Sequence, residues 1–294
     1  MVVRLIAGDK QNHKITILDE QYLVYSDKNG ISFEGISDIA YDANRQKLYL
    51  VGDRSMLFTL SATFDEKIEN LEYLSSYKIL RNDNLTDKYN LRTYDTEGLT
   101  FTPDNKILVA HERVAGVFEL SSTAKIIKNY TLPQKLQKDE NYRSKNKMLE
   151  SIAYHPKYGI VVASEYPLKE YKMRQQTIYS LDGKEWHFKS EKHKNSAITS
   201  IEVMDDGNIL VLERSYSGYL KPMRMILKKV YLDDCDENNN CQSEYLASFN
   251  SLKGEGFNNF EGLARVSKGR YVMISDNNGY ALLPTKLIYF EVKE

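Results

Sequence analysis

Acidic residues stand in pairs fifteen positions apart at three places in this 294-residue chain. The pairs are Glu97 with Glu112, Glu150 with Glu165, and Glu261 with Asp276, and Asn277 and Asn278 follow the last acid. Carboxylate and amide oxygens bind calcium, and a carboxylate can also act as a general base. Both kinds of chemistry require the two ends of each segment to meet.

The segments between the paired acids predict hairpins. Two short apolar runs flank a turn rich in Pro, Asp, Asn, Gly or Lys. The same pattern occurs five times, at residues 37–54, 97–113, 150–166, 198–214 and 261–278. The copies begin about 48 to 63 residues apart, a spacing typical of propeller blades and too long for helical repeats.

The repeats predict an all-β protein in which residues 1–294 form a single β-propeller domain of four-stranded antiparallel blades. Dividing the length by a period of about 55 predicts five blades, and six remain open if residues 1–30 contribute to more than one partial blade. We expect the N- and C-terminal strands to pair and close the ring, because an open sheet edge would otherwise be exposed.

In a propeller, the start of the innermost strand and the end of the next strand meet at one rim of the central channel. The rim is expected to carry the paired acids together with Ser37 or Asp38, Asp53 and Glu213. So many carboxylates repel one another unless something compensates. One solution is calcium, with these proposed ligands: Glu97, Glu150, Glu261, Asp276 and Asn277.

Arginines offer a second way to balance the acids. Arg54, Arg113 and Arg214 each follow the acid at the end of a second strand, where they can form a purely structural ion-pair network or bind an anion. Gly98 and Gly262 follow two of the leading acids, and we expect them to permit close backbone approach near the axis.

Candidate catalytic residues follow from this rim. Glu112 or Glu165 is a candidate base, His111 is another, and Arg113 or Arg214 can hold the anionic part of a substrate. Substrate contacts are assigned to Asp53, Arg54, Glu213 and Asn278. The sequence has no Gly-x-Ser-x-Gly, phosphate-loop or His-Glu-x-x-His motif, so the common hydrolase signatures are missing.

The nearly neutral net charge restricts the classes of molecule that the protein can be expected to bind. Forty basic and 41 acidic residues give a net charge of -1, so no overall field attracts nucleic acid or anionic lipid, and a small anionic ester or phosphorylated ligand must be recognised locally. We expect no membrane span, no signal peptide within the sequence as given, and a monomer.

The two cysteines, Cys235 and Cys241, are close enough in sequence to bridge a hairpin. A disulfide favours the periplasm or the exterior of the cell. The alternative is a pair of exposed, incidental thiols.

These motifs resemble the phytase-like family described as "esterase-like activity of phytase", a group of exported bacterial β-propellers. The resemblance covers roughly residues 30 to 292. It rests on FEGISDIAYDANRQKLYLVGDR, YDTEGLTFTPDNKILVAHER, NILVLERSYSG, FEGLARVSKGRYVMISDNN and TKLIYF. The third copy departs from the pattern, with ESIAYHP in place of an acid-Gly start and SEY without arginine.

The resemblance implies an exported propeller that hydrolyses phosphate or carboxylate esters. Analogy with calcium-loaded phytase propellers and propeller lactonases implies calcium at the channel mouth. The alternative is a binding or scaffolding propeller, in which the rim and some of the 22 tyrosines recognise a ligand without turnover.

Overall fold

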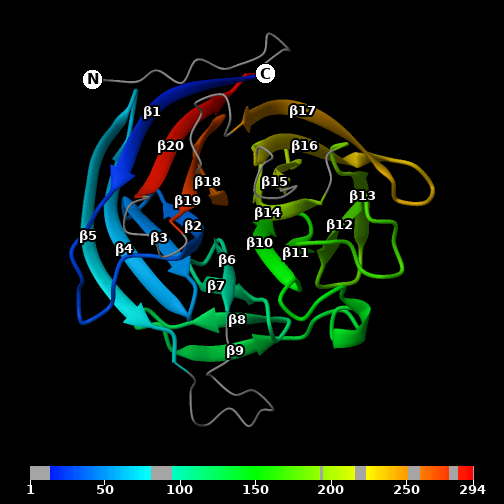
Figure 1. Ribbon diagram of the computed structural model, residues 1–294, viewed down its shortest axis with the longest axis horizontal. Helices are drawn as coiled ribbons and strands as arrows, with labels where there is room; N and C mark the ends of the chain where they lie inside the picture. Colours follow the sequence, from blue (N-terminus) through cyan, green and yellow to red (C-terminus); the bar gives the residue numbers. More distant parts are fainter. Residues whose placement is uncertain are drawn as a thin grey trace.

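Five antiparallel sheets surround a central axis in the computed structural model (Figure 1). The structure describes residues 14–80, 95–192, 195–215, 223–250, 259–277 and 284–293. Each sheet has four strands, and the innermost strands β2, β6, β10, β14 and β18 lie next to the axis. The predicted five-bladed propeller is therefore confirmed, and the six-bladed alternative is not formed.

The first four blades are built from consecutive strands. The first contains β2 (Ile36–Asp42), β3 (Lys47–Gly52), β4 (Met56–Phe64) and β5 (Ile68–Lys78). The second contains β6 (Thr96–Phe101), β7 (Ile107–His111), β8 (Gly116–Leu120) and β9 (Ile126–Tyr130). The third contains β10 (Leu149–His155), β11 (Gly159–Ser164), β12 (Gln175–Ser180) and β13 (Glu185–Lys189). The fourth contains β14 (Ser196–Val203), β15 (Ile209–Ser215), β16 (Arg224–Cys235) and β17 (Cys241–Asn250).

The fifth blade closes the ring. It contains β18 (Asn259–Ser267), β19 (Arg270–Asp276) and β20 (Thr285–Val292), and its outermost strand is β1 (Ile15–Leu23), which pairs antiparallel with β20. The predicted pairing of N- and C-terminal strands is thus confirmed. In the described part of the chain the only helical element is a 3-10 turn at Asp139–Asn141.

Apolar side chains fill the spaces between neighbouring blades. One core cluster joins Ile39 and Phe58 of the first blade to Ile274 and Tyr289 of the fifth. Similar clusters join the other neighbours. Because both faces of each blade are buried in this way, the second strands of the blades carry nearly continuous apolar runs, such as ILVAH in β7 and GIVVAS in β11.

Each inner strand contains a β-bulge close to its start. The register shifts between Ile36 and Asp38 in β2, and at the corresponding points of β6, β10, β14 and β18. A bulge places an extra residue out of register and re-aims its side chain. The bulged residues are Ser37, Glu97, Glu150, Thr199 and Glu261.

The glycines that follow two of the bulges lie against the neighbouring inner strand. A Cβ on Gly98 would be 2.9 Å from the Ile152 nitrogen, and a Cβ on Gly262 would be 2.8 Å from Asp38 Cα. Both atoms belong to backbone that is packed near the axis. The expected close approach is therefore present at both positions.

Replacing Gly262 by alanine is expected to lower the free energy of unfolding by about 1–3 kcal/mol, because the new methyl group overpacks this contact. The measurement is urea unfolding followed by circular dichroism. Ser151→Ala is the matched control, because Ser151 holds the equivalent position in the third blade and already carries a Cβ. Equal stability losses in the two variants would contradict the close-approach explanation.

The cysteines face each other across the β16–β17 hairpin. Cys235 pairs in register with Cys241, and the two form a disulfide. This confirms the predicted bridge. None of the helical structure in the described ranges has the length and hydrophobicity needed to span a bilayer.

Candidate functional site

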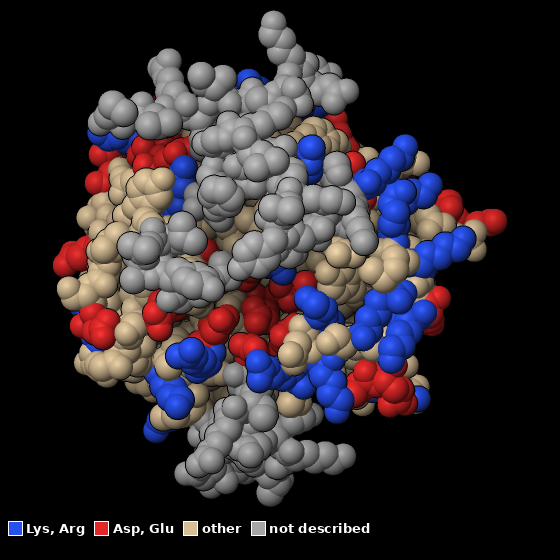
Figure 2. Space-filling view, viewed as in Figure 1, with Lys and Arg blue, Asp and Glu red and all other residues tan. Residues whose placement is uncertain are grey.

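Carboxylates from the second, third and fifth blades converge at one mouth of the channel. Oxygen atoms of Glu97, Glu150 and Glu261, the three acidic bulge residues, all lie within 4.8 Å of one another. Two further triads share members with this one, namely Asp53–Asp95–Glu97 and Glu112–Glu150–Glu165. We call these seven residues the acidic cluster. Acidic side chains gather at the centre of this face of the ring in Figure 2.

The oxygens of the Glu97–Glu150–Glu261 triad are spaced suitably for a divalent cation. Calcium binds hard oxygen ligands at 2.3–2.6 Å, so two ligands of one ion lie at most about 5 Å apart. Three carboxylates within 4.8 Å of one another meet this condition. The residues present therefore fit an oxygen-coordinated cation, in both donor type and spacing.

Crowding changes the proton affinity of the cluster. Burial, followed by repulsion from Glu165, raises the pKa of Glu150 well above its ordinary value. Burial and the nearby Glu261 raise the pKa of Glu97 in the same direction. Burial and Glu165 raise the pKa of Glu112 from 4.5 to about 8. At neutral pH Glu112 therefore holds a proton for most of the time unless a nearby cation lowers its pKa.

Stability without added metal is expected to fall as pH rises from about 5 to about 8. A carboxyl whose pKa is higher in the folded state favours folding at low pH, and that contribution is lost as pH rises through the folded pKa. Each carboxyl can contribute up to about 1.4 kcal/mol per pH unit. Melting temperatures in EDTA across this pH range would test the sign. A rising curve would contradict it, and millimolar calcium should flatten the decline if the cluster binds calcium.

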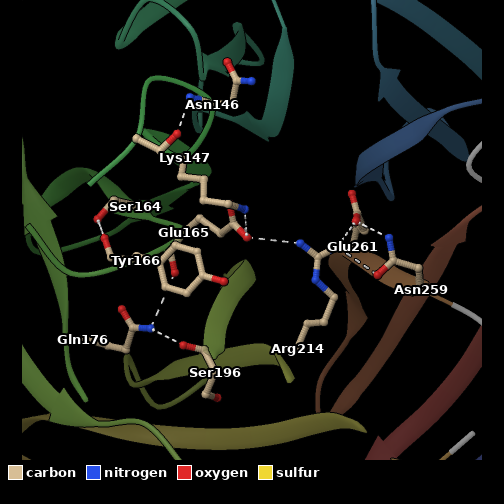
Figure 3. Close-up of polar contacts among 11 residues, drawn as sticks. Asn146, Lys147, Ser164, Glu165, Tyr166, Gln176, Ser196, Arg214, Asn259 and Glu261 are labelled. Carbon is tan, nitrogen blue, oxygen red and sulfur yellow. Dashed lines mark hydrogen bonds and ion pairs between the residues drawn. The ribbon is translucent and has the colours of Figure 1, made fainter. Parts of the chain in front are cut away.

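Two cationic side chains, Arg214 and Lys147, border the acidic cluster (Figure 3). Nη1 of Arg214 donates to Glu261 at 2.5 Å and to Asn259 at 2.9 Å, and Nη2 donates to Glu165 at 3.2 Å. Lys147 Nζ also donates to Glu165, at 2.7 Å. Glu165 and Glu261, which come from different blades, are thus tied together by one guanidinium.

The register of the fourth blade explains why an arginine stands here. Fifteen residues separate the bulge from the rim acid in Glu97–Glu112, Glu150–Glu165 and Glu261–Asp276, and the same count from Thr199 leads to Arg214. Glu213 instead pairs with Ile198 in the register. Its carboxylate is buried within the blade and accepts hydrogen bonds from Ser196 Oγ at 3.0 Å and Lys228 Nζ at 3.2 Å. The structure therefore places Glu213 away from the expected rim position.

His111 lies inside the second blade. Its ring is fully buried, packs edge-on against Phe118 at 4.8 Å, and has Nδ1 3.5 Å from Thr96 Oγ1. Burial lowers the pKa of His111 to about 3. Such a weakly basic ring does not favour the expected role as a general base at neutral pH.

The remaining predicted residues lie around the cluster. Arg113 Nε is 3.2 Å from Asp95, and Asp53 accepts a hydrogen bond from Ser37 Oγ at 3.0 Å. Arg54 is exposed in the turn after β3. Asn277 accepts a hydrogen bond from the Gly35 nitrogen at 3.1 Å, which links the fifth blade to the first.

Two predicted residues lie outside the triads or outside the described chain. Asp276 ends β19 opposite Asn259 and belongs to none of the carboxylate triads found in the described ranges. Asn278 falls outside the described residues. Of the five proposed metal ligands, the structure therefore brings three together, and they come from three blades.

The family assignment agrees with this architecture. The family model described as "Phytase-like: Esterase-like activity of phytase" matches residues 31–279. The chain belongs to this phytase-like family. It matches none of the curated proteins with which it was compared.

Solved structures resemble this phytase-like chain at low sequence identity. A PQQ-bound aldose sugar dehydrogenase from Streptomyces coelicolor is 8% identical, with a TM-score of 0.50 and coverage of 94% of this chain and 97% of that one. A luciferin-regenerating enzyme is 10% identical, with a TM-score of 0.44 and coverage of 89% and 95%. At these identities the likeness concerns the fold alone.

Three residues of the phytase-like site were missed by the sequence-based prediction. Asp95 and Asn259 each lie two residues before a bulge glutamate, so an [Asp/Asn]-x-Glu-Gly pattern in the second and fifth copies identifies both. Lys147 lies in the connection that precedes β10. It belongs to no repeated pattern, so the sequence carries no signal for it.

Proposed function

We propose that this phytase-like propeller is a divalent-cation-dependent hydrolase of phosphate or carboxylate esters or lactones, with its site at the acidic mouth of the channel. The observation that carries the proposal is the convergence of Glu97, Glu150 and Glu261 from three blades within 4.8 Å. The family description, which names an esterase-like activity, supports the same class of reaction.

Calcium is the proposed cation, and Glu97, Glu150 and Glu261 are its proposed ligands. When bound, such a cation polarises a phosphoryl or carbonyl oxygen and lowers the pKa of a coordinated water. The excess of carboxylates over cations in the cluster supports this choice, since hard oxygen ligands suit calcium.

Glu112 is the better of the two candidate bases. Its pKa of about 8 leaves it near the proton affinity that favours proton transfer at neutral pH. Glu165 already accepts hydrogen bonds from both Lys147 and Arg214, so its oxygens are engaged by two cationic side chains. We therefore assign proton transfer to Glu112 and a charge-balancing role to Glu165.

The anionic part of the substrate would contact cations at the edge of the cluster. Arg113 and Lys147 have side chains that are 49% and 38% exposed, so solvent and a ligand can reach both. Arg214 is less exposed and already donates to Glu165, Glu261 and Asn259. We assign Arg214 to positioning of the two acids and Arg113 and Lys147 to substrate contact.

Two measurements on the full chain test the proposal. Calcium binding is measured by isothermal titration, and hydrolysis is measured with p-nitrophenyl phosphate, p-nitrophenyl acetate and a γ-lactone, in calcium and in EDTA. We expect saturable binding and calcium-stimulated hydrolysis of at least one substrate. Absence of both refutes the proposal. Calcium binding without hydrolysis contradicts the enzymatic part and favours a binding propeller.

The binding alternative involves tyrosines in the segments 73–80, 87–94 and 215–222. Tyr73 is buried and Tyr77 is exposed on the outer strand β5, whereas the tyrosines at 89, 94, 216 and 219 fall outside the described residues. The disulfide between Cys235 and Cys241 supports our proposal that the protein works in an oxidising compartment, the periplasm or the exterior.

A further inference from the structure

A cavity lies at the opposite end of the channel from the acidic cluster. The inner strands begin at the acidic mouth, and their final residues line this cavity, which has a volume of about 530 Å³. That volume is typical of small-molecule sites. Residues of all five blades contribute to its wall. We call it the distal pocket and define it by Tyr41, Phe101, Tyr154, Glu202 and Arg265.

Aromatic rings from three adjacent blades form one wall of the distal pocket. Tyr41, Phe101 and Tyr154 occupy equivalent positions near the ends of β2, β6 and β10, and each is only partly buried. Val203 and Arg265 hold the same position in the other two blades. The aromatic wall therefore covers three blades, and a valine and an arginine complete the ring.

The rings are fixed by contacts behind them. Tyr41 donates to the Ala62 carbonyl at 3.1 Å, and its ring packs edge-on against Phe64 at 5.0 Å. Phe101 packs against Tyr49 at 5.0 Å. Tyr154 packs on the core cluster between the second and third blades. A ligand would therefore meet preformed apolar surfaces and would not have to order them.

Most charges on the opposite wall are already balanced. Three ion pairs account for these charges. They join Asp205 to Arg265 Nη1 at 2.9 Å, Asp206 to Lys229 Nζ at 2.5 Å, and Asp233 to Lys157 Nζ at 3.0 Å. These three pairs leave no excess charge of either sign.

Glu202 is different. Within the ranges that the structure describes, its carboxylate accepts two backbone hydrogen bonds, from the Arg265 nitrogen at 3.0 Å and the Val203 nitrogen at 2.7 Å. Among the described residues, no lysine or arginine side chain forms an ion pair with it. The equivalent residues of the other blades are small, namely Ala40, Thr100, Ala153 and Ala264. Packing of the inner strand therefore does not require a glutamate here.

We propose that the distal pocket binds a small organic cation, a primary or quaternary ammonium, with its charge against Glu202 and its alkyl groups against Tyr41, Phe101 and Tyr154. Aromatic rings attract ammonium groups, and the attraction grows when water is excluded. The ligand would supply a direct ion-pair partner for Glu202, whose carboxylate feels the charge of Arg265 while that arginine pairs with Asp205. The site is separate from the acidic cluster, so the inference does not depend on the proposed hydrolysis.

The test uses the full chain and choline as the probe, with 3,3-dimethylbutan-1-ol as the uncharged ligand of the same shape. Titration calorimetry is expected to give saturable choline binding, with the uncharged compound at least tenfold weaker. Glu202→Gln and Tyr154→Leu are each expected to weaken choline binding at least tenfold. Glu119→Gln, a buried glutamate of the second blade, is the matched control and should bind as the parent does.

Circular dichroism and melting curves confirm that each variant is folded. Three results would each overturn the proposal: no saturable choline binding by the folded parent, equal binding of the uncharged compound, or unchanged binding by Glu202→Gln. Ester hydrolysis should be unchanged in Glu202→Gln, so failure of this inference can be distinguished from failure of the proposed activity.

Discussion

Glu150→Gln is expected to remove calcium binding and to reduce calcium-stimulated hydrolysis at least 100-fold. Glu150 belongs to two of the three carboxylate triads, so its replacement weakens both at once. Loss of several kcal/mol of electrostatic stabilisation corresponds to two or more orders of magnitude in rate. Calorimetry and initial rates with the best ester substrate provide the measurements.

The same variant should be more stable than the parent in EDTA at pH 8. Glutamine has nearly the same shape but carries no charge, so repulsion with Glu97, Glu165 and Glu261 is relieved. Calcium should then raise the melting temperature of the parent and leave that of the variant unchanged. Glu119→Gln controls for the loss of a buried carboxylate elsewhere, since Glu119 accepts a hydrogen bond from Tyr130.

Opposite results would identify a structural network. If the acids serve only to tie loops together, Glu150→Gln would lower stability in EDTA and calcium would shift neither protein. The prediction therefore separates a metal site from a set of structural ion pairs by the sign of one melting-temperature difference.

Arg214→Met is expected to lower the free energy of unfolding by about 3–5 kcal/mol in EDTA at pH 8, because it leaves two buried carboxylates without their shared partner. The loss should shrink toward pH 5, because burial raises the pKa of Glu261 and protonation removes its charge. Urea unfolding at the two pH values measures both quantities.

Two further variants sharpen this prediction. Arg270→Met removes an arginine of similar exposure that pairs with Glu66 and Glu291 on the surface, and it should cost much less. Glu261→Gln added to Arg214→Met should recover part of the lost stability. A pH-independent loss, or no recovery in the double variant, would contradict the charge-balancing role of Arg214.

The hairpin repeats were sufficient to predict the propeller, its closure by β1 and β20, and the meeting of Glu97, Glu150 and Glu261. Each of these follows from the repeated pattern of apolar runs and turns, and from the antiparallel direction of neighbouring strands. The position of Glu213 was not predicted correctly, because a shift of one residue turns a strand side chain to the other face. The register of this pair shifts at the bulge formed by Thr199.

Other parts of the site depend on contacts that local patterns do not encode. Lys147 reaches Glu165 from a blade connection without a repeat, and the burial that lowers the pKa of His111 comes from packing within the second blade. The sequence motif around His111 correctly predicted that this residue ends the second strand of its hairpin, which is β7. Its environment could be established only from the three-dimensional arrangement.

The three acidic bulges, which belong to three blades, make the acidic mouth a property of the closed ring. Glu97 and Glu261 are far apart in sequence and belong to the second and fifth blades, yet one ion bound between them and Glu150 would join distant parts of the chain without a covalent link. Such a ligand binds only the native arrangement and so adds its binding energy to folding. Metal affinity would therefore report on the assembly of the whole propeller, and damage to an outer strand such as β1 would weaken a site it never touches.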